Sequence, residues 1–410
     1  MEMENLFSAA LGLCSPWKVV TVTFDQEAGS IRGLVEIHID FDRGSRFCDS
    51  SGVSCGVHDT VRRTWEHMSF FQHRCLLHAR VPRIRTSGDD VHTVEVPWAR
   101  PGSSFTLLFE AMGMLLIKSE MPVSSVADLL GVYDNRVWRF FNHWVEKAKA
   151  KQQLKEVVAI GVDEVARKKG HNYNTVVVDL DKHDVIYVIE GKGKEALKAA
   201  ADHIQENGGS AEKITNISMD MSPAFISGAK AYFPNAQVTF DKFHIVKVIH
   251  AAMDQVRRDE QRKSADFKKT RYLWLKNDDN LKQEDIQKRE SLAEQYPEIG
   301  KAYRLKTIFR EFWEFNDPTK AAKHLNDWCH EAVESGLQPF IEATKTIKAH
   351  WEGIINHIRS GLNNGVLEGI NSKIQLAKRR ARGYSNNGNL INMIYFTCGN
   401  LIYDYPLLTT

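Results

Sequence analysis

Residues 157–164 read VVAIGVDE, an apolar run with the length of a buried strand that closes on two acids. Four further runs have the composition of strands: TVVVDL at 175–180, VIYVIE at 185–190, ITNISMD at 214–220 and AQVTF at 236–240. Helical periodicity appears before, between and after the last two of these runs, over 194–206, 222–232 and 242–258. Strands that alternate with helices in this way predict an α/β domain that begins near residue 151.

Residues 254–350 have no strand character and are dense in Lys, Glu, Gln and Ala. Eleven basic and eleven acidic residues stand between 254 and 300, a balance that is typical of solvated helical faces. We therefore expect helices throughout this stretch. An Asn- and Gly-rich turn follows residue 358, and a basic helix, KIQLAKRRARGY at 373–384, comes after the turn.

Three acids are notable for their positions at the ends of elements. Asp163 ends the first predicted strand, Asp220 ends the fourth, and Glu368 opens the basic helix. Neighbouring strands can bring distant carboxylates together, and converging carboxylates are the hard oxygen ligands that suit Mg²⁺. Two such ions can hold the attacking and leaving oxygens of a phosphoryl transfer. The alternative for each acid alone is a solvated turn residue or a helix cap, which is the commoner role.

A second acidic position lies in TFDKFHIVK, residues 239–247, where Asp241 and His244 follow the fifth strand. One interpretation places His244 near the metal ions or the scissile phosphate as an active-site auxiliary. The other makes Asp241 the N-cap of the next helix and His244 a buried histidine with satisfied nitrogens. The capping preference of Asp favours the second interpretation.

The charge of the whole chain hides local differences. The 54 Lys and Arg residues almost cancel the 52 Asp and Glu residues, leaving a formal charge of +2. Residues 369–384 nevertheless carry positive side chains and no acids: Lys373, Lys378, Arg379, Arg380 and Arg382. This helix predicts a surface that follows DNA phosphates, with a solvated helix face as the alternative.

Composition limits the class of protein. With 43% hydrophobic and 26% charged residues, the chain is neither largely disordered nor fibrous. Six scattered cysteines indicate reduced thiols. The N-terminus lacks the basic region of a signal peptide, and the longest apolar run, residues 105–117, is too short to span a bilayer. We expect a soluble, cytoplasmic protein.

The first hundred residues predict a small β-rich module. Residues 17–41 form two strands around a polar turn at 25–30, and in the second strand Val35, Ile37, Ile39 and Phe41 alternate with polar residues. Residues 43–100 hold Gly, Cys, His and Arg in short extended runs.

Residues 123–148 change to a helical period, with two segments joined at Gly131. A helix-turn-helix at this place would direct Asn135, Arg136 and Arg139 toward a major groove. The alternative is an ordinary helical hairpin.

Taken together and in this order, four stretches resemble the ISL3 family of bacterial insertion-sequence transposases, which are DDE enzymes. They are IGVDEVARKKGHNYNTVVVDL, ISMDMSPAFISGAKAYFPNA, VTFDKFHIVK and NNGVLEGINSKIQLAKRRARGY. The resemblance covers nearly the whole chain. It implies an RNase H-like core in which Asp163, Asp220 and Glu368 form the catalytic triad and hold two Mg²⁺ or Mn²⁺ ions.

The resemblance also implies an α/β multidomain architecture: an RNase H-like core interrupted by an all-α insertion, preceded by a zinc-ribbon-like module and a helix-turn-helix. The expected domains are 1–100 and 101–150 for DNA binding, 151–253 and 359–410 for the core, and 254–358 for the insertion. The expected reaction is cleavage at the terminal inverted repeats, followed by attack of the freed 3′-OH on target DNA. Two ends must be paired, so a homodimer or larger assembly is expected on double-stranded DNA in the bacterial nucleoid.

The family's zinc ribbon is the least complete part of the resemblance. Such a module needs two C-x₂-C knuckles, whereas here Ser51 follows Cys48 at the required spacing. Cys48 and Cys55 are the candidate ligands, and a tetrahedral set is missing, so a zinc site is doubtful and the module can retain its fold without metal.

Two alternatives stay open from the sequence. One is a catalytically inactive DNA-binding protein derived from a transposase, and the other is an RNase H-like nuclease without strand transfer. Acids at all three triad positions argue against the first, and a strand-transfer assay separates the second.

Overall fold

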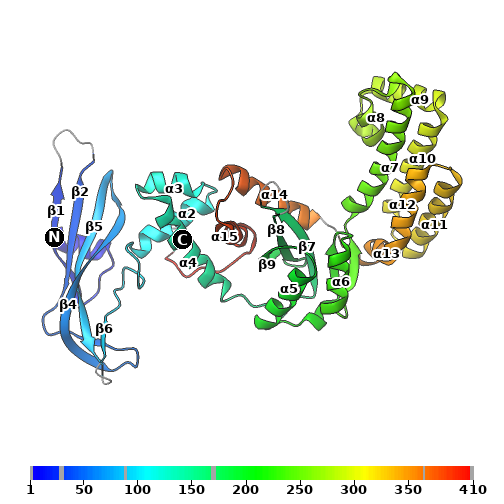
Figure 1. The fold of residues 1–410 in the computed structure, drawn as a ribbon. Helices are drawn as coiled ribbons and strands as arrows, with labels where there is room; N and C mark the ends of the chain where they lie inside the picture. Colours follow the sequence, from blue (N-terminus) through cyan, green and yellow to red (C-terminus); the bar gives the residue numbers. More distant parts are fainter. Residues whose placement is uncertain (1–2, 27–31, 87–89, 168–171, 363–364, 407–410) are drawn as a thin grey trace. The chain divides into compact units, whose positions relative to one another are not determined.

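The computed structural model describes residues 3–26, 32–86, 90–167, 172–362 and 365–406. Parts of the predicted turn at 25–30 and of two quoted motifs, 168–171 and 363–364, lie outside the described residues. Contacts divide the chain into two units. Unit 1 comprises Met1–Lys151, Leu376–Phe396 and Leu401–Thr410, and unit 2 comprises Gln152–Gln375 and Thr397–Asn400. Each unit is drawn in Figure 1.

Unit 1 begins with helix α1 (Met3–Ala10) and a six-stranded sheet. Its strands are β1 (Trp17–Asp25), β2 (Leu34–Phe41), β3 (Arg46–Cys48), β4 (Ser54–Phe70), β5 (His73–Arg85) and β6 (Val91–Thr93). The main path runs β1-β2-β5-β4-β3, and β6 pairs with β5. The alternation predicted for β2 is confirmed for Val35, Ile37 and Ile39, which are buried, whereas Phe41 at the end of the strand is half-buried.

The expectation of short extended runs over 43–100 was wrong. β4 has 17 residues and β5 has 13, and they pair antiparallel along most of their lengths. Most side chains of β4 are exposed or half-buried, so the strand lacks the apolar alternation from which its length could be read. The backbone hydrogen bonds between β4 and β5 stabilise the strand where its side chains contribute little apolar burial.

Helices complete unit 1: α2 (Leu107–Lys118), α3 (Val123–Leu130), α4 (Asp134–Lys149), the end of α14 (Gly365–Arg380) and most of α15 (Asn387–Cys398). The carboxylate of Glu110 is fully buried, and it accepts hydrogen bonds from Arg100 Nε (2.9 Å), Ser103 Oγ (2.6 Å) and Trp144 Nε1 (2.8 Å). A buried charge with a full set of donors fixes α2 against α4. Gly113 lets Phe140 approach α2, since a Cβ there would lie 2.4 Å from its ring.

Unit 2 contains the five strands that the sequence predicts: β7 (Ala159–Ala166), β8 (Tyr173–Asp179), β9 (Asp184–Glu190), β10 (Asn216–Met219) and β11 (Gln237–Phe240). Their order is β11-β10-β7-β8-β9. β7, β10 and β11 are parallel, whereas β8 is antiparallel to both of its neighbours. The predicted helices are present as α5 (Lys194–Glu206) and α6 (Pro223–Tyr232). The mixed α/β expectation is confirmed.

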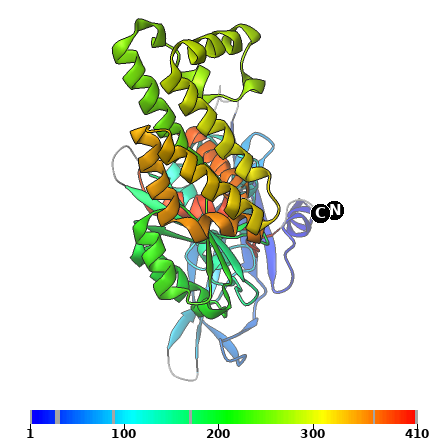
Figure 2. The ribbon, with the colours of Figure 1, turned by 90° about the vertical axis from the view of Figure 1, so that its right-hand side faces the viewer.

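Between β11 and α14, the described residues of unit 2 form helices and connecting turns without a strand, as the sequence predicts. The helices are α7 (Lys242–Lys263), α8 (Arg271–Leu275), α9 (Gln283–Gln295), α10 (Pro297–Glu311), α11 (Pro318–Glu334), α12 (Gln338–Ala349) and α13 (Trp351–Ser360). Short 3₁₀ turns lie at Ala211–Lys213, Ala265–Phe267, Asp278–Asn280 and Phe312–Glu314. α7 packs against α10 and α12, and α11 packs against α12 and α13, so long helices lie side by side (Figure 2).

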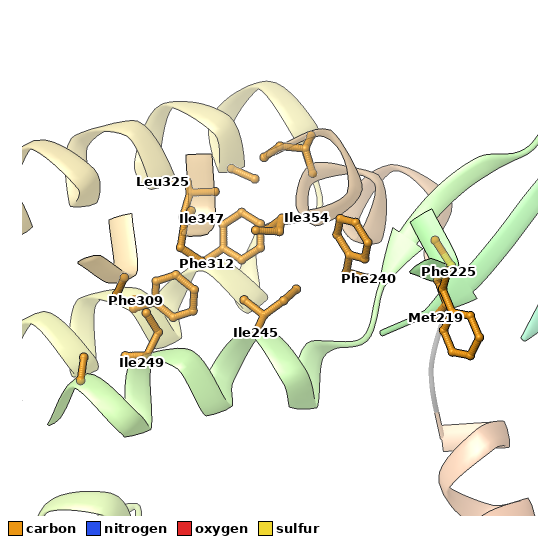
Figure 3. Packing of buried hydrophobic residues seen from close by; sticks show 14 of the residues in the cluster. Met219, Phe225, Phe240, Ile245, Ile249, Phe309, Phe312, Leu325, Ile347 and Ile354 are labelled. Atoms are coloured by element: carbon orange, nitrogen blue, oxygen red, sulfur yellow. The ribbon is translucent and has the colours of Figure 1, made fainter. Parts of the chain in front are cut away.

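One hydrophobic core joins the sheet of unit 2 to these helices (Figure 3). Phe240 at the end of β11 lies beside Ile354 of α13, and the cluster continues to Ile245 and Phe312. Gly353 makes this approach feasible, because a Cβ there would lie 2.3 Å from the Phe240 ring. No described helix combines the length and the apolar character that a membrane crossing requires.

Candidate functional site

Three aspartates lie near one edge of the parallel strands of unit 2: Asp220 and Asp241 directly follow β10 and β11, whereas Asp163 lies within β7. Ser218 of β10 pairs with Gly161 of β7, and Met219 pairs with Phe240 of β11. Continued along the chain, this register sets Asp220 level with both Asp163 and Asp241. Open α/β sheets bind ligands at this edge, and the register explains why acids 57 and 78 positions after Asp163 share it.

Asp163 is held from two sides. Its Oδ1 accepts a hydrogen bond from the amide of Glu164 at 2.7 Å, and its Oδ2 accepts one from Asn371 Nδ2 of α14. Burial raises the pKa of Asp163, and the two donors act against that shift. The prediction that Asp163 ends its strand was wrong: β7 continues to Ala166, because Glu164, Val165 and Ala166 pair with Thr175, Asn174 and Tyr173 of β8.

Asp220 follows β10 directly, in the position that the sequence indicates. Its Oδ1 accepts a hydrogen bond from the Ser222 amide at 2.8 Å and so shapes the turn into α6. Glu164 is a further acid that sequence reasoning overlooked. Burial raises its pKa, and the nearby charges of Asp220 and Asp163 raise it further. Crowded carboxylates with raised pKa values are a common property of sites that bind cations.

Asp241 caps α7, because its Oδ1 accepts a hydrogen bond from the Phe243 amide at 2.8 Å. The capping interpretation of Asp241 is therefore confirmed. His244 is partly exposed rather than buried. Its charge lowers the pKa of Asp163 and that of Glu164, so the imidazole lies within electrostatic range of both acids.

Glu368 reaches this edge of the sheet on α14. The Leu367 side chain packs on Gly161, where an added Cβ would lie 2.9 Å from a Leu367 methyl carbon. One turn later Asn371 contacts Asp163. Glu368 precedes Asn371 by three residues, a spacing that puts both on one side of a helix. Its exposed side chain lines a cavity of about 560 Å³ that Asp241, Trp313 and His357 also line.

The donor chemistry of this edge suits a hard cation, since every candidate ligand is a carboxylate. Among the residues that the structure describes, no three His, Cys, Asp or Glu side chains are gathered closely enough to hold an ion. What the fold supplies is the alignment of Asp163 with Asp220 and the anchoring of the Glu368 helix beside Asp163.

The zinc candidates of unit 1 do not form a pair. Cys55 lies opposite Phe47 and is buried with it, whereas Cys48 is the next residue along β3 and is exposed. Successive residues of a strand point to opposite faces, so the two thiols do not converge on one ion. Cys55 contributes to the hydrophobic core of the sheet instead.

Helices α3 and α4 form the predicted pair, joined through Gly131 in the left-handed conformation, with φ of 70°. Asn135 and Arg139 are exposed on α4. Arg136 is turned toward its own unit: it pairs with Glu66 at 3.5 Å, donates to Ser104 Oγ at 3.1 Å and stacks on Phe105. Arg136 thus has protein partners, whereas Asn135 and Arg139 present exposed side chains.

The basic helix is present as α14, which ends at Arg380, so Arg382 lies beyond it with a positive φ of 55°. Lys373, Arg379 and Arg382 are exposed, while burial lowers the pKa of Lys378. Arg380 pairs with Glu120 at 2.5 Å.

Residues 359–410 were expected to belong together with the core. In the division by contacts, Leu376–Phe396 and Leu401–Thr410 group with unit 1, whereas the residues up to Gln375 group with unit 2.

Comparison with known proteins identifies the family. Residues 160–394 match the model of a transposase family, and residues 94–145 match the helix-turn-helix domain of transposase family ISL3. The chain is 27% identical over 355 residues to the transposase for insertion sequence element IS1001 of Bordetella parapertussis, a match that covers 82% of this chain and 85% of that protein. It is 24% identical to the transposase for insertion sequence element IS1557 of Mycobacterium tuberculosis, over 97% of this chain and 96% of that protein. The predicted helix-turn-helix is confirmed, and the chain belongs to the ISL3 family of DDE transposases.

Proposed function

We propose that the chain binds the terminal inverted repeats of an insertion sequence and catalyses metal-dependent DNA cleavage and strand transfer. The observation that carries the proposal is the hydrogen bond from Asn371 to Asp163. It joins α14, which bears Glu368, to the strand that bears the first acid. The register of β7 with β10 brings the second acid, Asp220, to the same edge. Three acids far apart in sequence thereby serve one site.

Asp163, Asp220 and Glu368 are the residues that would hold two Mg²⁺ or Mn²⁺ ions, which when bound supply Lewis-acid stabilisation of the pentavalent phosphate. The protein's own contribution is positional. Asn371 and the Glu164 amide fix the Asp163 carboxylate, and the Asp220 carboxylate is fixed by the Ser222 amide. His244 is an auxiliary group within electrostatic range of Asp163.

The sheet supports an RNase H-like core, since three parallel strands are flanked on one side by two strands in antiparallel connection. We infer that residues 1–150 recognise DNA, that 151–253 and 359–410 supply the catalytic acids and the basic helix, and that 254–358 form the insertion. Asn135 and Arg139 on α4, with Lys373, Arg379 and Arg382, are the exposed candidates for DNA contact.

The test is incubation of the purified protein with a duplex that carries an inverted repeat and its flank, with Mg²⁺, followed by mapping of the cuts. Asp163→Asn, Asp220→Asn and Glu368→Gln should each lower cleavage by about a thousand-fold or more, since each removes several kcal/mol of transition-state stabilisation. DNA affinity should stay within a few-fold of wild type. Undiminished cleavage by any of the three variants would remove that residue from the triad.

A thermal-shift measurement provides a readout besides activity. Mg²⁺ should raise the Tm of the wild-type protein and leave that of the Asp163→Asn/Asp220→Asn double variant unchanged, because only bound ion stabilises the fold.

The two alternatives predict different products. An inactive DNA-binding protein binds the duplex without cuts, and a nuclease without strand transfer cuts but joins no 3′-OH end to target DNA.

Pairing of two transposon ends further requires at least a dimer of the protein on DNA. Light scattering of the protein with and without the duplex tests that inference.

A further inference from the structure

A second groove runs along α7 and α8 in the helical part of unit 2. It encloses about 510 Å³, and its walls include Phe243, Lys247, Asp254, Arg258 and Arg271. We call it the α7–α8 groove. Phe243 and Val246 line this groove and also the cavity that Glu368 and Asp241 line. The groove therefore begins where the candidate catalytic cavity ends.

A buried carboxylate organises the far end of the groove. Asp254 is only 8% exposed and pairs with Arg257 at 2.8 Å, with Arg258 at 2.9 Å and with Arg271 at 3.7 Å. Burial acts to raise the pKa of Asp254, but the hydrogen bond and charge of Arg257, with the charges of Arg258 and Arg271, lower it overall. Three guanidinium groups around one carboxylate leave an excess of two positive charges.

The excess charge is accessible. Arg258 and Arg271 are 58% and 55% exposed, and each forms an ion pair with Asp254. One carboxylate engages only part of each guanidinium, so N–H groups remain for a ligand. Guanidinium forks of this kind recognise phosphate oxygens.

Exposed aromatic rings accompany these cations. Phe243 is 59% exposed and Tyr272 is 62% exposed. The guanidinium of Arg271 and the ammonium of Lys276 lie 6.0 Å and 5.7 Å from the Tyr272 ring centre. Phe243 and Arg271 line the groove, and Tyr272 and Lys276 lie next to it, on α8 and directly after it. Exposed rings beside cations are typical of surfaces that stack on unpaired bases and hold the backbone by charge.

The length of the groove fits the same DNA that enters the catalytic cavity. Seventeen residues of α7 separate Asp241 from Arg258, a rise of about 25 Å. At about 3.4 Å per base pair, this distance corresponds to roughly seven base pairs. A duplex cut at the Asp241 end would therefore pass the arginines within its first helical turn.

We propose that the α7–α8 groove binds the sugar–phosphate backbone of the transposon-end DNA on one side of the cut. Arg258 and Arg271 contact phosphates, and Phe243 contacts the base nearest the scissile phosphate. The inference rests on the proposed function, because that function supplies the DNA. It also explains how an insertion with balanced charge can contact DNA, because three arginines are concentrated around the single carboxylate of Asp254.

The test compares Arg258→Gln/Arg271→Gln with wild type. Arg304→Gln is the matched control, because Arg304 is a 72% exposed arginine of α10 that pairs with Glu331 and does not line the groove. Affinity for the inverted-repeat duplex is measured over a series of salt concentrations. The double variant should bind at least about ten-fold more weakly, and its log–log salt slope should be smaller by about two, whereas the control should match wild type. Thermal melting verifies that each variant is folded.

Cross-linking shows which part of the duplex lies against the α7–α8 groove. A photoreactive phenylalanine analogue in place of Tyr272 should cross-link to the duplex roughly seven base pairs from the cut. An unchanged salt slope in the folded double variant, or cross-links that never include DNA, would overturn the groove proposal. Cleavage of the same duplex by the wild-type protein is measured in parallel and tests the proposed function separately. The salt slope and the cross-links depend only on DNA binding, so they test the groove proposal even if no cleavage occurs.

Discussion

At the scale of single residues, the chemistry of the candidate site depends on contacts that cannot be predicted from a local sequence pattern. Asp163, Asp220 and Glu368 could be selected from the sequence because the first two follow apolar runs and the third opens a basic helical pattern, although β7 continues past Asp163. Asn371 and Glu164 could not. Asn371 acts through a contact across 208 positions, and Glu164 sits where strand alternation assigns it to the face opposite Asp163.

Asn371 is a positioning residue, and its loss should affect the reaction rather than DNA binding. In Asn371→Leu, the Asp163 carboxylate loses a donor that fixes its direction, so cleavage should fall by about ten- to a hundred-fold. Ser372→Ala, which alters the exposed neighbour on α14, is the control. Single-turnover cleavage and duplex affinity are measured together. If Asn371→Leu and the control cleaved DNA at equal rates, the hydrogen bond between Asn371 and Asp163 would have no role in the reaction.

The raised pKa of Glu164 predicts a pH-dependent stability. An acid whose pKa is higher in the folded state than in the unfolded state destabilises the fold as pH rises, because the unfolded chain loses the proton first. Stability is complete below the ordinary carboxyl pKa and declines as pH rises through the raised value. Burial and Asp220 are the main causes of the rise.

Glu164→Gln removes this ionisation. Without divalent metal, we expect a higher Tm than wild type at about pH 7, by at most about 1 kcal/mol in stability, and a much smaller gain at about pH 4, where the carboxyl group is mostly protonated in both states. Glu156→Gln is the control, since Glu156 is an 81% exposed acid of the same unit. A gain of equal size at both pH values would contradict the assignment to a raised pKa.

At the scale of elements, prediction succeeded where apolar periodicity is strong. The five strands of unit 2, with α5 and α6, lie within a few residues of their predicted positions, since their buried faces are read directly from apolar residues. It failed for β4, which carries Arg, His and Asp on mostly exposed faces. It also failed for the end of β7, where pairing with β8 extends the strand past Asp163.

Glycine substitutions in two helices should change stability in opposite directions. Gly113→Ala puts a Cβ 2.4 Å from the Phe140 ring, and overpacking of this kind costs about 1–3 kcal/mol. Because Phe140 belongs to α4, DNA affinity should fall as well. Gly369→Ala meets no atom within 4 Å, so helix propensity should stabilise α14 by about 0.5–1 kcal/mol. Thermal unfolding and duplex binding measure both effects. A stabilised Gly113→Ala variant would show that α2 and α4 are less closely packed.

At the scale of the whole molecule, the sequence could not reveal that unit 1 is built from separated segments. Trp138 and Phe141 of α4 contact Tyr384 and Phe396, with ring centres 6.0 Å and 5.2 Å apart. Asn142 donates to Asn389 at 2.9 Å and accepts from Asn392 at 3.1 Å. A helix-turn-helix is recognised from local spacing, whereas the segment that covers one face of α4 follows it by more than two hundred residues.

A fragment of residues 1–151 should therefore be less stable than unit 1 in the full chain. Removal of the segment 376–406 exposes the aromatic face of α4, at a cost on the order of 3 kcal/mol, since burial of one large apolar side chain contributes about 1.5–3 kcal/mol. We expect the fragment to melt at lower temperature and to bind the inverted-repeat duplex more weakly. Fusion of 376–406 to its C-terminus through a flexible linker should restore both properties. The same fusion with Tyr384→Ser and Phe396→Ser is the control, because it restores chain length without the aromatic contacts. If 1–151 alone matched the intact fusion in Tm and affinity, the C-terminal segment would be dispensable for recognition, and the chain would separate into a binding part and a cutting part in simple sequence order.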